Sequence, residues 1–153
     1  SGEGATFWFI LPLNEVPLKY EAALKAPTNN LRSWEDKKIL IAEDDHSNYY
    51  FLFESLKDTG AEILWSKDGE ETMELFREHS DLHVVLMDIN MPLMNGYECT
   101  RQIKKERPDL PVIAQTAYAM SGEREVSRKA GCDDYLAKPI KVSELLNTLS
   151  RYL

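Results

Sequence analysis

Five short apolar runs constrain the fold of this chain more than any other feature of the sequence. The runs cover residues 39–42, 63–65, 84–87, 112–114 and 135–137. Within each run the apolar residues are consecutive and do not alternate with polar ones, which is typical of strands buried on both faces of a parallel sheet. The sequence therefore predicts five buried strands in the part of the chain that begins near residue 37.

The segments between the apolar runs have the period of an amphipathic α-helix. The i, i+3, i+4, i+7 spacing is met by Tyr49, Leu52, Phe53 and Leu56, by Thr72, Leu75, Phe76 and His79, by Val142, Leu145, Leu146 and Leu149, and more weakly by Gly96, Cys99, Thr100 and Ile103. Gly60, Pro108 and Gly131 are helix-ending residues after the first, third and fourth helical segments. This alternation predicts an α/β fold with a doubly wound, five-stranded parallel sheet flanked by five helices.

The N-terminal part of the chain differs from the rest. The stretch GATFWFIL predicts one strand, and residues 14–36 carry prolines and turn-forming residues that are typical of a linker. An apolar strand without its own sheet is prone to aggregate, so we expect this tail to dock on the domain or to mediate a dimer with a neighbouring chain. The expected organisation is a tail over residues 1–13, a linker over residues 14–36 and one domain over residues 37–153.

Charge and cysteine content exclude several classes of protein. The formal net charge is −8, and a general grip on nucleic-acid phosphates needs a basic face, so we expect no direct contact with nucleic acid. Cys99 and Cys132 lack the spacing and the neighbouring histidines of a metal site, which predicts reduced thiols in a cytoplasmic protein. No apolar run has the length of a membrane span, so we expect no membrane contact by this chain.

Polar side chains follow the predicted strands at the edge where an open parallel sheet gathers its functional groups. They are Glu43, Asp44 and Asp45 after the first strand, Asp88 after the third, Thr116 after the fourth and Lys138 after the fifth. Any one of these residues alone is more often a helix cap or a turn residue than a functional group. Because they all fall at strand ends, we expect them to converge on one crevice.

These residue types suit phosphoryl transfer. Clustered carboxylates repel one another and need a cation, and hard oxygen ligands with open positions suit Mg²⁺. A carboxylate can be the nucleophile in phosphoryl transfer, and the charge that develops on the phosphoryl oxygens then needs Mg²⁺, a lysine and a hydroxyl or amide donor. Asp88, one or both of Asp44 and Asp45, Lys138 and Thr116 supply these parts.

Four stretches of the sequence carry a family resemblance. ILIAEDD, VVLMDINMPLMNGYE, PVIAQTA and AGCDDYLAKPI occur in this order between about residue 37 and residue 153. Together they resemble a receiver domain of two-component signalling, the response-regulator fold. The resemblance implies a flavodoxin-like sheet with the strand order 2-1-3-4-5.

The resemblance also implies roles for the acidic residues. Asp88 matches the residue that accepts the phosphoryl group. Asp45 and Asp88 would ligate Mg²⁺ directly and Asp44 through a water molecule, with the backbone carbonyl of Asn90 as a further ligand. Asn90 and Tyr118 occupy the two variable positions that influence the lifetime of the acyl phosphate. We expect the aromatic ring of Tyr118 to slow hydrolysis relative to a Tyr118→Ala variant.

Other matched positions would hold and report the phosphoryl group. Lys138 would contact it, with a cis bond to the following proline, and the Thr116 hydroxyl and the Ala117 amide would bind its oxygens. Thr116 and Tyr135 match the pair that reports phosphorylation to the face made by the fourth helix, the fifth strand and the fifth helix. Gly96 matches the glycine that opens the third helix.

The N-terminal stretch GEGATFWFILPL resembles the last strand of a histidine kinase ATP-binding domain. Placed before a receiver domain, it implies that the chain is the C-terminal part of a hybrid sensor histidine kinase, at the cytoplasmic end of a membrane-bound sensor. The catalytic boxes of such a kinase and its phosphorylatable histidine are absent from this sequence. The chain would therefore catalyse only its own phosphorylation and dephosphorylation.

The leading interpretation is a phosphorelay module. It would take a phosphoryl group from a phosphohistidine on a kinase domain and pass it to a histidine phosphotransfer partner. The alternative is a Mg²⁺-dependent phosphohydrolase with an Asp nucleophile, but the position two residues after Asp88 is Asn90, which cannot act as a general acid. A flavodoxin-like cofactor site is disfavoured because EDDHSN follows the first strand and would repel an anionic cofactor.

Overall fold

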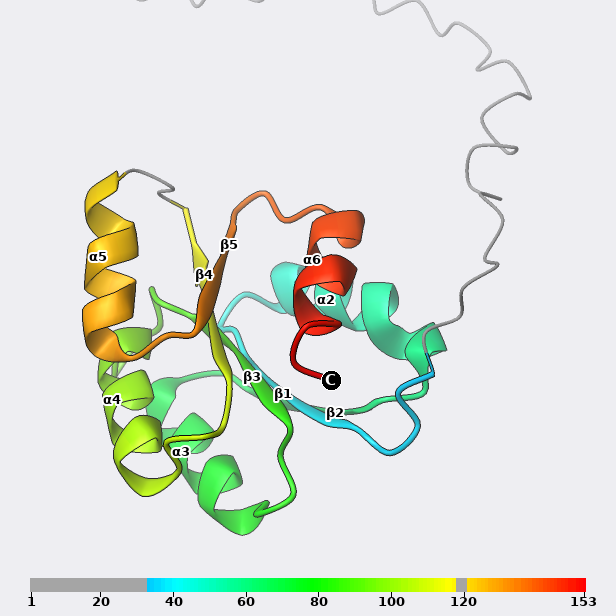
Figure 1. The fold of residues 1–153 in the computed structure, drawn as a ribbon, viewed down its shortest axis with the longest axis horizontal. Helices are drawn as coiled ribbons and strands as arrows, with labels where there is room; N and C mark the ends of the chain where they lie inside the picture. Colours follow the sequence, from blue (N-terminus) through cyan, green and yellow to red (C-terminus); the bar gives the residue numbers. More distant parts are fainter. Residues whose placement is uncertain (1–32, 118–120) are drawn as a thin grey trace, which may run out of the picture. The chain divides into compact units, whose positions relative to one another are not determined.

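A computed structural model describes residues 33–117 and 121–153, in which strands and helices alternate along the chain (Figure 1). The strands are β1 (Lys38–Ala42), β2 (Glu62–Ser66), β3 (Val84–Asp88), β4 (Val112–Thr116) and β5 (Asp134–Ala137). The helices are α2 (His46–Leu56), α3 (Gly69–Glu78), α4 (Gly96–Glu106), α5 (Ser121–Ala130) and α6 (Val142–Leu149), with a 3-10 turn η1 (Lys57–Thr59) after α2. Each of the five strands predicted between residues 39 and 137 is present, longer by one or two residues at one or both ends.

The five strands form one parallel sheet in the order β2-β1-β3-β4-β5. This confirms the predicted fold class and strand order. The predicted N-terminal strand and nearly all of the linker lie outside the described residues, and so does Tyr118.

Helices cover both faces of the sheet, and each face has its own apolar core (Figure 1). We call one side the α2/α6 face; its buried residues include Ile39, Ile41, Leu52, Leu56, Val84, Leu86, Ile113, Leu136, Leu145 and Leu149. We call the other the α3/α4 face; its buried residues include Leu40, Ala42, Met73, Phe76, Val85, Met87, Cys99, Ile103, Val112 and Ala114. Side chains of a strand alternate between the two, so residue parity decides which face a side chain enters.

Side-chain caps begin three of the helices. At the start of α2, the carboxylate of Asp45 accepts a hydrogen bond from the backbone amide of Asn48 at 2.9 Å. At the start of α3, the carboxylate of Asp68 accepts one from the backbone amide of Glu71 at 2.8 Å. Asn95 caps α4 in the same way. A cap of this kind contributes about 1 kcal/mol by satisfying an amide that has no partner within the helix.

Two further predictions concern the cysteines and membrane spans. Cys99 and Cys132 are both free thiols, as expected. Among the helices of the described residues, none combines the length and the apolar character that crossing a bilayer requires.

Candidate acidic site at the carboxyl edge of the sheet

Strand register brings the predicted residues to one height at the carboxyl edge. Asp88 ends β3 opposite Gln115 of β4, and Ala42 of β1 is opposite Met87, so Glu43 is level with Asp88. Glu43 and Asp88 share the parity of the α2/α6 core residues of their strands, as Gln115 and Lys138 do. These four side chains are therefore directed to the α2/α6 face of the sheet.

Lys138 joins two carboxylates in this cluster. Its Nζ donates to Asp88 Oδ2 at 2.6 Å and to Glu43 Oε2 at 2.8 Å. The Glu43 side chain is fully buried and that of Asp88 is 6% exposed, while Lys138 is 23% exposed. Burial lowers the pKa of Lys138, but the bonds to Asp88 and Glu43 outweigh it, so the pKa is raised overall and the ammonium stays charged.

Glu43 is held by three neighbours. Its Oε1 accepts from Asn48 Nδ2 at 2.9 Å, Lys138 binds Oε2, and its backbone carbonyl accepts from Trp65 Nε1 at 2.8 Å. Burial raises the pKa of the Glu43 carboxyl, and the bonds from Lys138 and Asn48 only partly offset this. The buried Glu43 carboxylate therefore belongs to the same cluster as Lys138 and Asp88, and is more than an extra acid before Asp44 and Asp45.

The two aspartates after Glu43 lie in different surroundings. One carboxylate oxygen each from Glu43, Asp44 and Asp88 lie within 4.8 Å of one another. The Asp45 carboxylate instead caps α2, although Asp44 and Asp45 are both exposed. The geometry favours Glu43 over Asp45 as the third acid of the cluster.

Asp88 is fixed on its other side by the loop that follows β3. Its Oδ1 accepts from the Asn90 amide at 3.1 Å. Gly96 opens α4 as the resemblance implies, and its amide donates to the Ile89 carbonyl at 3.1 Å. A Cβ atom on Gly96 would lie 2.2 Å from the Asp88 carbonyl oxygen, so the close approach of α4 to the acid requires a glycine here.

The remaining predicted residues lie in or directly after β4 and β5. Thr116 is buried at the end of β4, where its carbonyl accepts from the Lys138 amide at 2.8 Å, and Ala117 follows it at the surface. Tyr135 is half-buried and packs against the α3/α4 core. The bond between Lys138 and Pro139 is cis, which confirms that implication of the resemblance.

The cluster carries more negative than positive charge. Three carboxylates approach one another within the described residues, and Lys138 is the ammonium that bridges two of them. Like charges this close destabilise one another unless a further cation joins them. The arrangement can hold a divalent cation and present a buried carboxylate to an electrophile beside a lysine.

The fold and this acid–lysine edge define a phosphoacceptor module of two-component signalling. A family model described as the response regulator receiver domain matches residues 39–150. The chain belongs to this family.

Two bacterial proteins extend this result. The chain is similar to the polar-differentiation response regulator DivK of Brucella ovis, with 37% identity over 119 residues that cover 76% of this chain and 96% of the relative. It is similar to the receiver domain of sensor histidine kinase PA1611 from Pseudomonas aeruginosa PAO1, whose structure has a magnesium ion coordinated in the active site cleft. That match has a TM-score of 0.70 and 35% identity, and covers 76% of this chain and 96% of that one.

A second structure shares the fold at lower identity. It is the receiver domain of the Saccharomyces cerevisiae response regulator Ssk1, crystallised with the histidine phosphotransfer protein Ypd1. The TM-score is 0.72 at 24% identity, over 76% of this chain and 88% of that one.

Sequence reasoning undervalued three residues of this edge. The family resemblance gives a role to Asp44 and Asp45 but none to Glu43, and the sequence pattern marks neither Asn48 nor Gln115. The available signal was parity, because Glu43 and Gln115 continue the alternation of their strands onto the face that carries Asp88. Asn48 was detectable only as the residue one helical turn after the Asp45 cap.

Proposed function

We propose that Asp88 is the phosphoacceptor of this receiver domain. The observation that carries the proposal is the contact between Asp88 and Lys138, in which a nearly buried carboxylate at the end of the central strand lies 2.6 Å from an ammonium. The ammonium can neutralise charge on a phosphoryl group attached to the carboxylate. Among the clustered acids, Asp88 alone lies within a strand, where it is paired with Gln115 of β4.

The acids fit a magnesium ion. The donor set consists of carboxylate oxygens within 4.8 Å of one another, which suits a hard cation that keeps some of its waters. We infer that Asp44 and Asp88 hold the ion together with the backbone carbonyl of Asn90, and that Glu43 takes the place expected for Asp45. When bound, the ion neutralises charge on the acids and on the incoming phosphoryl oxygens.

The residues of the chain then account for the transfer. An Asp88 oxygen attacks the phosphorus of a phosphohistidine, the P–N bond breaks and the imidazole leaves with its electron pair, which gives an acyl phosphate. Lys138 remains beside the new group, and the Thr116 hydroxyl and the Ala117 amide bind phosphoryl oxygens. Glu43 and Asn48 keep Lys138 in position, since Glu43 binds both of them.

The partners and the larger protein are part of the proposal. A histidine kinase domain supplies the phosphoryl group, and a histidine phosphotransfer protein receives it. A receiver of the same fold binds such a protein in the Ssk1 complex, and the PA1611 receiver belongs to a sensor histidine kinase. The stretch over residues 1–13 supports a hybrid kinase here as well. Thr116 and Tyr135 would report phosphorylation to the face made by α5, β5 and α6.

Phosphorylation by a small donor tests the central claim. The protein is incubated with Mg²⁺ and acetyl phosphate, and intact-mass spectrometry measures the gain of one phosphoryl group. We expect the wild type to be labelled and Asp88→Asn to remain unlabelled. Asp81→Asn is the matched control, because Asp81 is an exposed acid paired with Lys38 at the start of β1, and it should label like the wild type. Equal labelling of Asp88→Asn and wild type would refute the assignment.

A further inference from the structure

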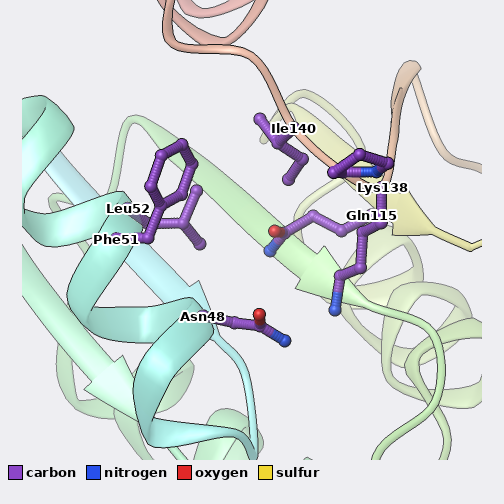
Figure 2. A pocket seen from close by; sticks show the side chains of 7 residues that line it. Asn48, Phe51, Leu52, Gln115, Lys138 and Ile140 are labelled. Atoms are coloured by element: carbon purple, nitrogen blue, oxygen red, sulfur yellow. The ribbon is translucent and has the colours of Figure 1, made fainter. Parts of the chain in front are cut away.

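A cavity of about 490 Å³ lies beside the acidic site on the α2/α6 face. Figure 2 shows Phe51 and Leu52 of α2 on one side, and Ile140, from the segment between β5 and α6, on the other. Gln115 of β4 lies between them, and its amide points toward Leu52 and Asn48 and away from Lys138. The size and the mostly apolar lining are those of a site for a small molecule.

The amide of Gln115 has no partner. Gln115 is fully buried, and neither its Oε1 nor its Nε2 has a hydrogen-bond partner in the described part of the chain. Most buried polar groups are paired, so an orphaned amide that lines a cavity requires an explanation. The alternation of side chains along β4 explains why Gln115 faces the cavity, since it lies two residues after Ile113 on the same face. It does not explain why the residue at this position is polar.

The charges around the cavity are already matched to other groups. Lys138 lines the cavity, and its ammonium forms ion pairs with Glu43 and Asp88. The side-chain Nδ2 of Asn48 donates to Glu43. The groups that still lack a hydrogen-bond partner are therefore those of the Gln115 amide. Its Oε1 is an acceptor and its Nε2 is a donor, and the two lie side by side. A neutral amide edge meets both, whereas a carboxylate, which only accepts, would leave the Gln115 oxygen unpaired and bring a further negative charge near the acids.

We propose that this cavity, which we call the Gln115 pocket, binds a small neutral molecule with a primary carboxamide or lactam edge on a compact apolar body. The polar edge pairs with the Gln115 amide, and the apolar body contacts Phe51, Leu52 and Ile140. This function is additional to phosphoryl transfer and does not depend on it. Asn48 and Lys138 belong to the lining and to the acidic cluster at once, so the two sites are neighbours that share residues.

The test uses benzamide as the probe and acetophenone as its match. Acetophenone has the same ring and carbonyl but no N–H donor. The full chain is labelled with ¹⁵N and titrated with each compound while amide chemical shifts are recorded. A ligand of so few atoms is expected to bind in the millimolar range. Benzamide should give saturable shifts in residues 48–52 and 136–141, with an affinity about tenfold higher than that of acetophenone.

Gln115→Met separates the amide from the shape of the pocket. Methionine keeps an unbranched chain of similar length and removes both polar atoms, so the variant should fold and give a dispersed spectrum. Benzamide should bind it about tenfold more weakly than wild type, and acetophenone at least as well as before. The proposal is overturned if benzamide gives no saturable shifts, if the two probes bind wild type equally, or if Gln115→Met binds benzamide unchanged. In the first case the pocket holds ordered water only.

Discussion

The two faces of the sheet are built from the same five strands but treat their polar groups differently. On the α3/α4 face, buried hydroxyls are paired within the fold: Ser66 Oγ and Thr72 Oγ1 lie 2.8 Å apart, and the Thr100 hydroxyl donates to the Gly96 carbonyl at 2.7 Å. On the α2/α6 face, the clustered carboxylates outnumber the one ammonium, that of Lys138, that bridges two of them. The Gln115 amide there has no hydrogen-bond partner among the described residues. Uncompensated charge and unpaired polar groups are thus concentrated on the α2/α6 face, which is where we expect binding and chemistry.

The largest effect should come from removing the cation between the acids. Lys138→Met leaves Glu43 and Asp88 buried without their ammonium, so we expect the free energy of unfolding to fall by about 2–3 kcal/mol in EDTA. Adding Mg²⁺ should restore about 1–2 kcal/mol of this loss, because the ion binds only the folded state. Urea unfolding at neutral pH measures both quantities.

The control is Lys129→Met, which removes an ammonium from an exposed pair with Glu125. Such a pair contributes less than about 1 kcal/mol, so its loss should be small and independent of Mg²⁺. Equal destabilisation by the two variants would mean that Lys138 is no more important to the fold than a surface lysine.

A pair of aspartate variants should sharpen the assignment of the acids. Asp44→Asn removes a proposed ligand and should weaken Mg²⁺ binding about tenfold or more. Asp45→Asn keeps a good helix cap and should change the affinity by less than about threefold. Isothermal titration calorimetry of both variants against wild type distinguishes these outcomes. A larger loss of Mg²⁺ affinity in Asp45→Asn than in Asp44→Asn would instead support Asp45 as a ligand, as expected from the sequence.

Opposite signs of stability change should separate the two faces. Gln115→Met removes a buried amide that has no partner, so we expect stability to rise by about 1 kcal/mol. Thr72→Val removes one partner of the Ser66–Thr72 pair, leaves the Ser66 hydroxyl unsatisfied and should lower stability by about 1 kcal/mol. Thermal and urea unfolding of the two variants measure the signs. A loss of stability in Gln115→Met would show that its amide is satisfied in the folded protein.

The smallest effect concerns the thiol on the α3/α4 face. Burial raises the pKa of Cys99 to about 11. In the unfolded chain the thiol loses its proton at lower pH, so the unfolded state binds fewer protons between the two pKa values and stability falls as pH rises. We expect a loss of about 0.5 kcal/mol by about pH 9 and slow reaction with a disulfide reagent in the native state. Fast native labelling of a Cys132→Ser variant would contradict the dry environment assigned to Cys99.

Most of the fold and the main contact of the site follow from the sequence. Consecutive apolar residues predicted the five strands, and their order followed from the family resemblance. The position of Asp88 and Lys138 at strand ends predicted that they meet, and their 2.6 Å contact confirms it. The strands and the meeting of Asp88 with Lys138 follow from local periodicity and from where the strands end, whereas the strand order required the family resemblance.

The rest depends on spatial detail that the sequence does not carry. Three acids follow β1 in a row, and a choice between Glu43 and Asp45 needs the strand register and the start of α2 to within one residue. The roles of Asn48 and Gln115 arise from packing between α2, β4 and the segment after β5, which are distant in sequence. A glutamine inside an apolar strand carries no local sign that it will lack a partner.

Gly96 has a consequence for how a signal can leave the site. Its backbone lies against the Asp88 carbonyl with no room for a side chain, and its amide is bonded to Ile89. The first turn of α4 is thereby packed directly against the end of β3. If Asp88 accepts a phosphoryl group as proposed, we expect these two elements to leave no room for movement toward α4. We then expect displacement in the strands β4 and β5, since Thr116 ends β4 and Lys138 directly follows β5.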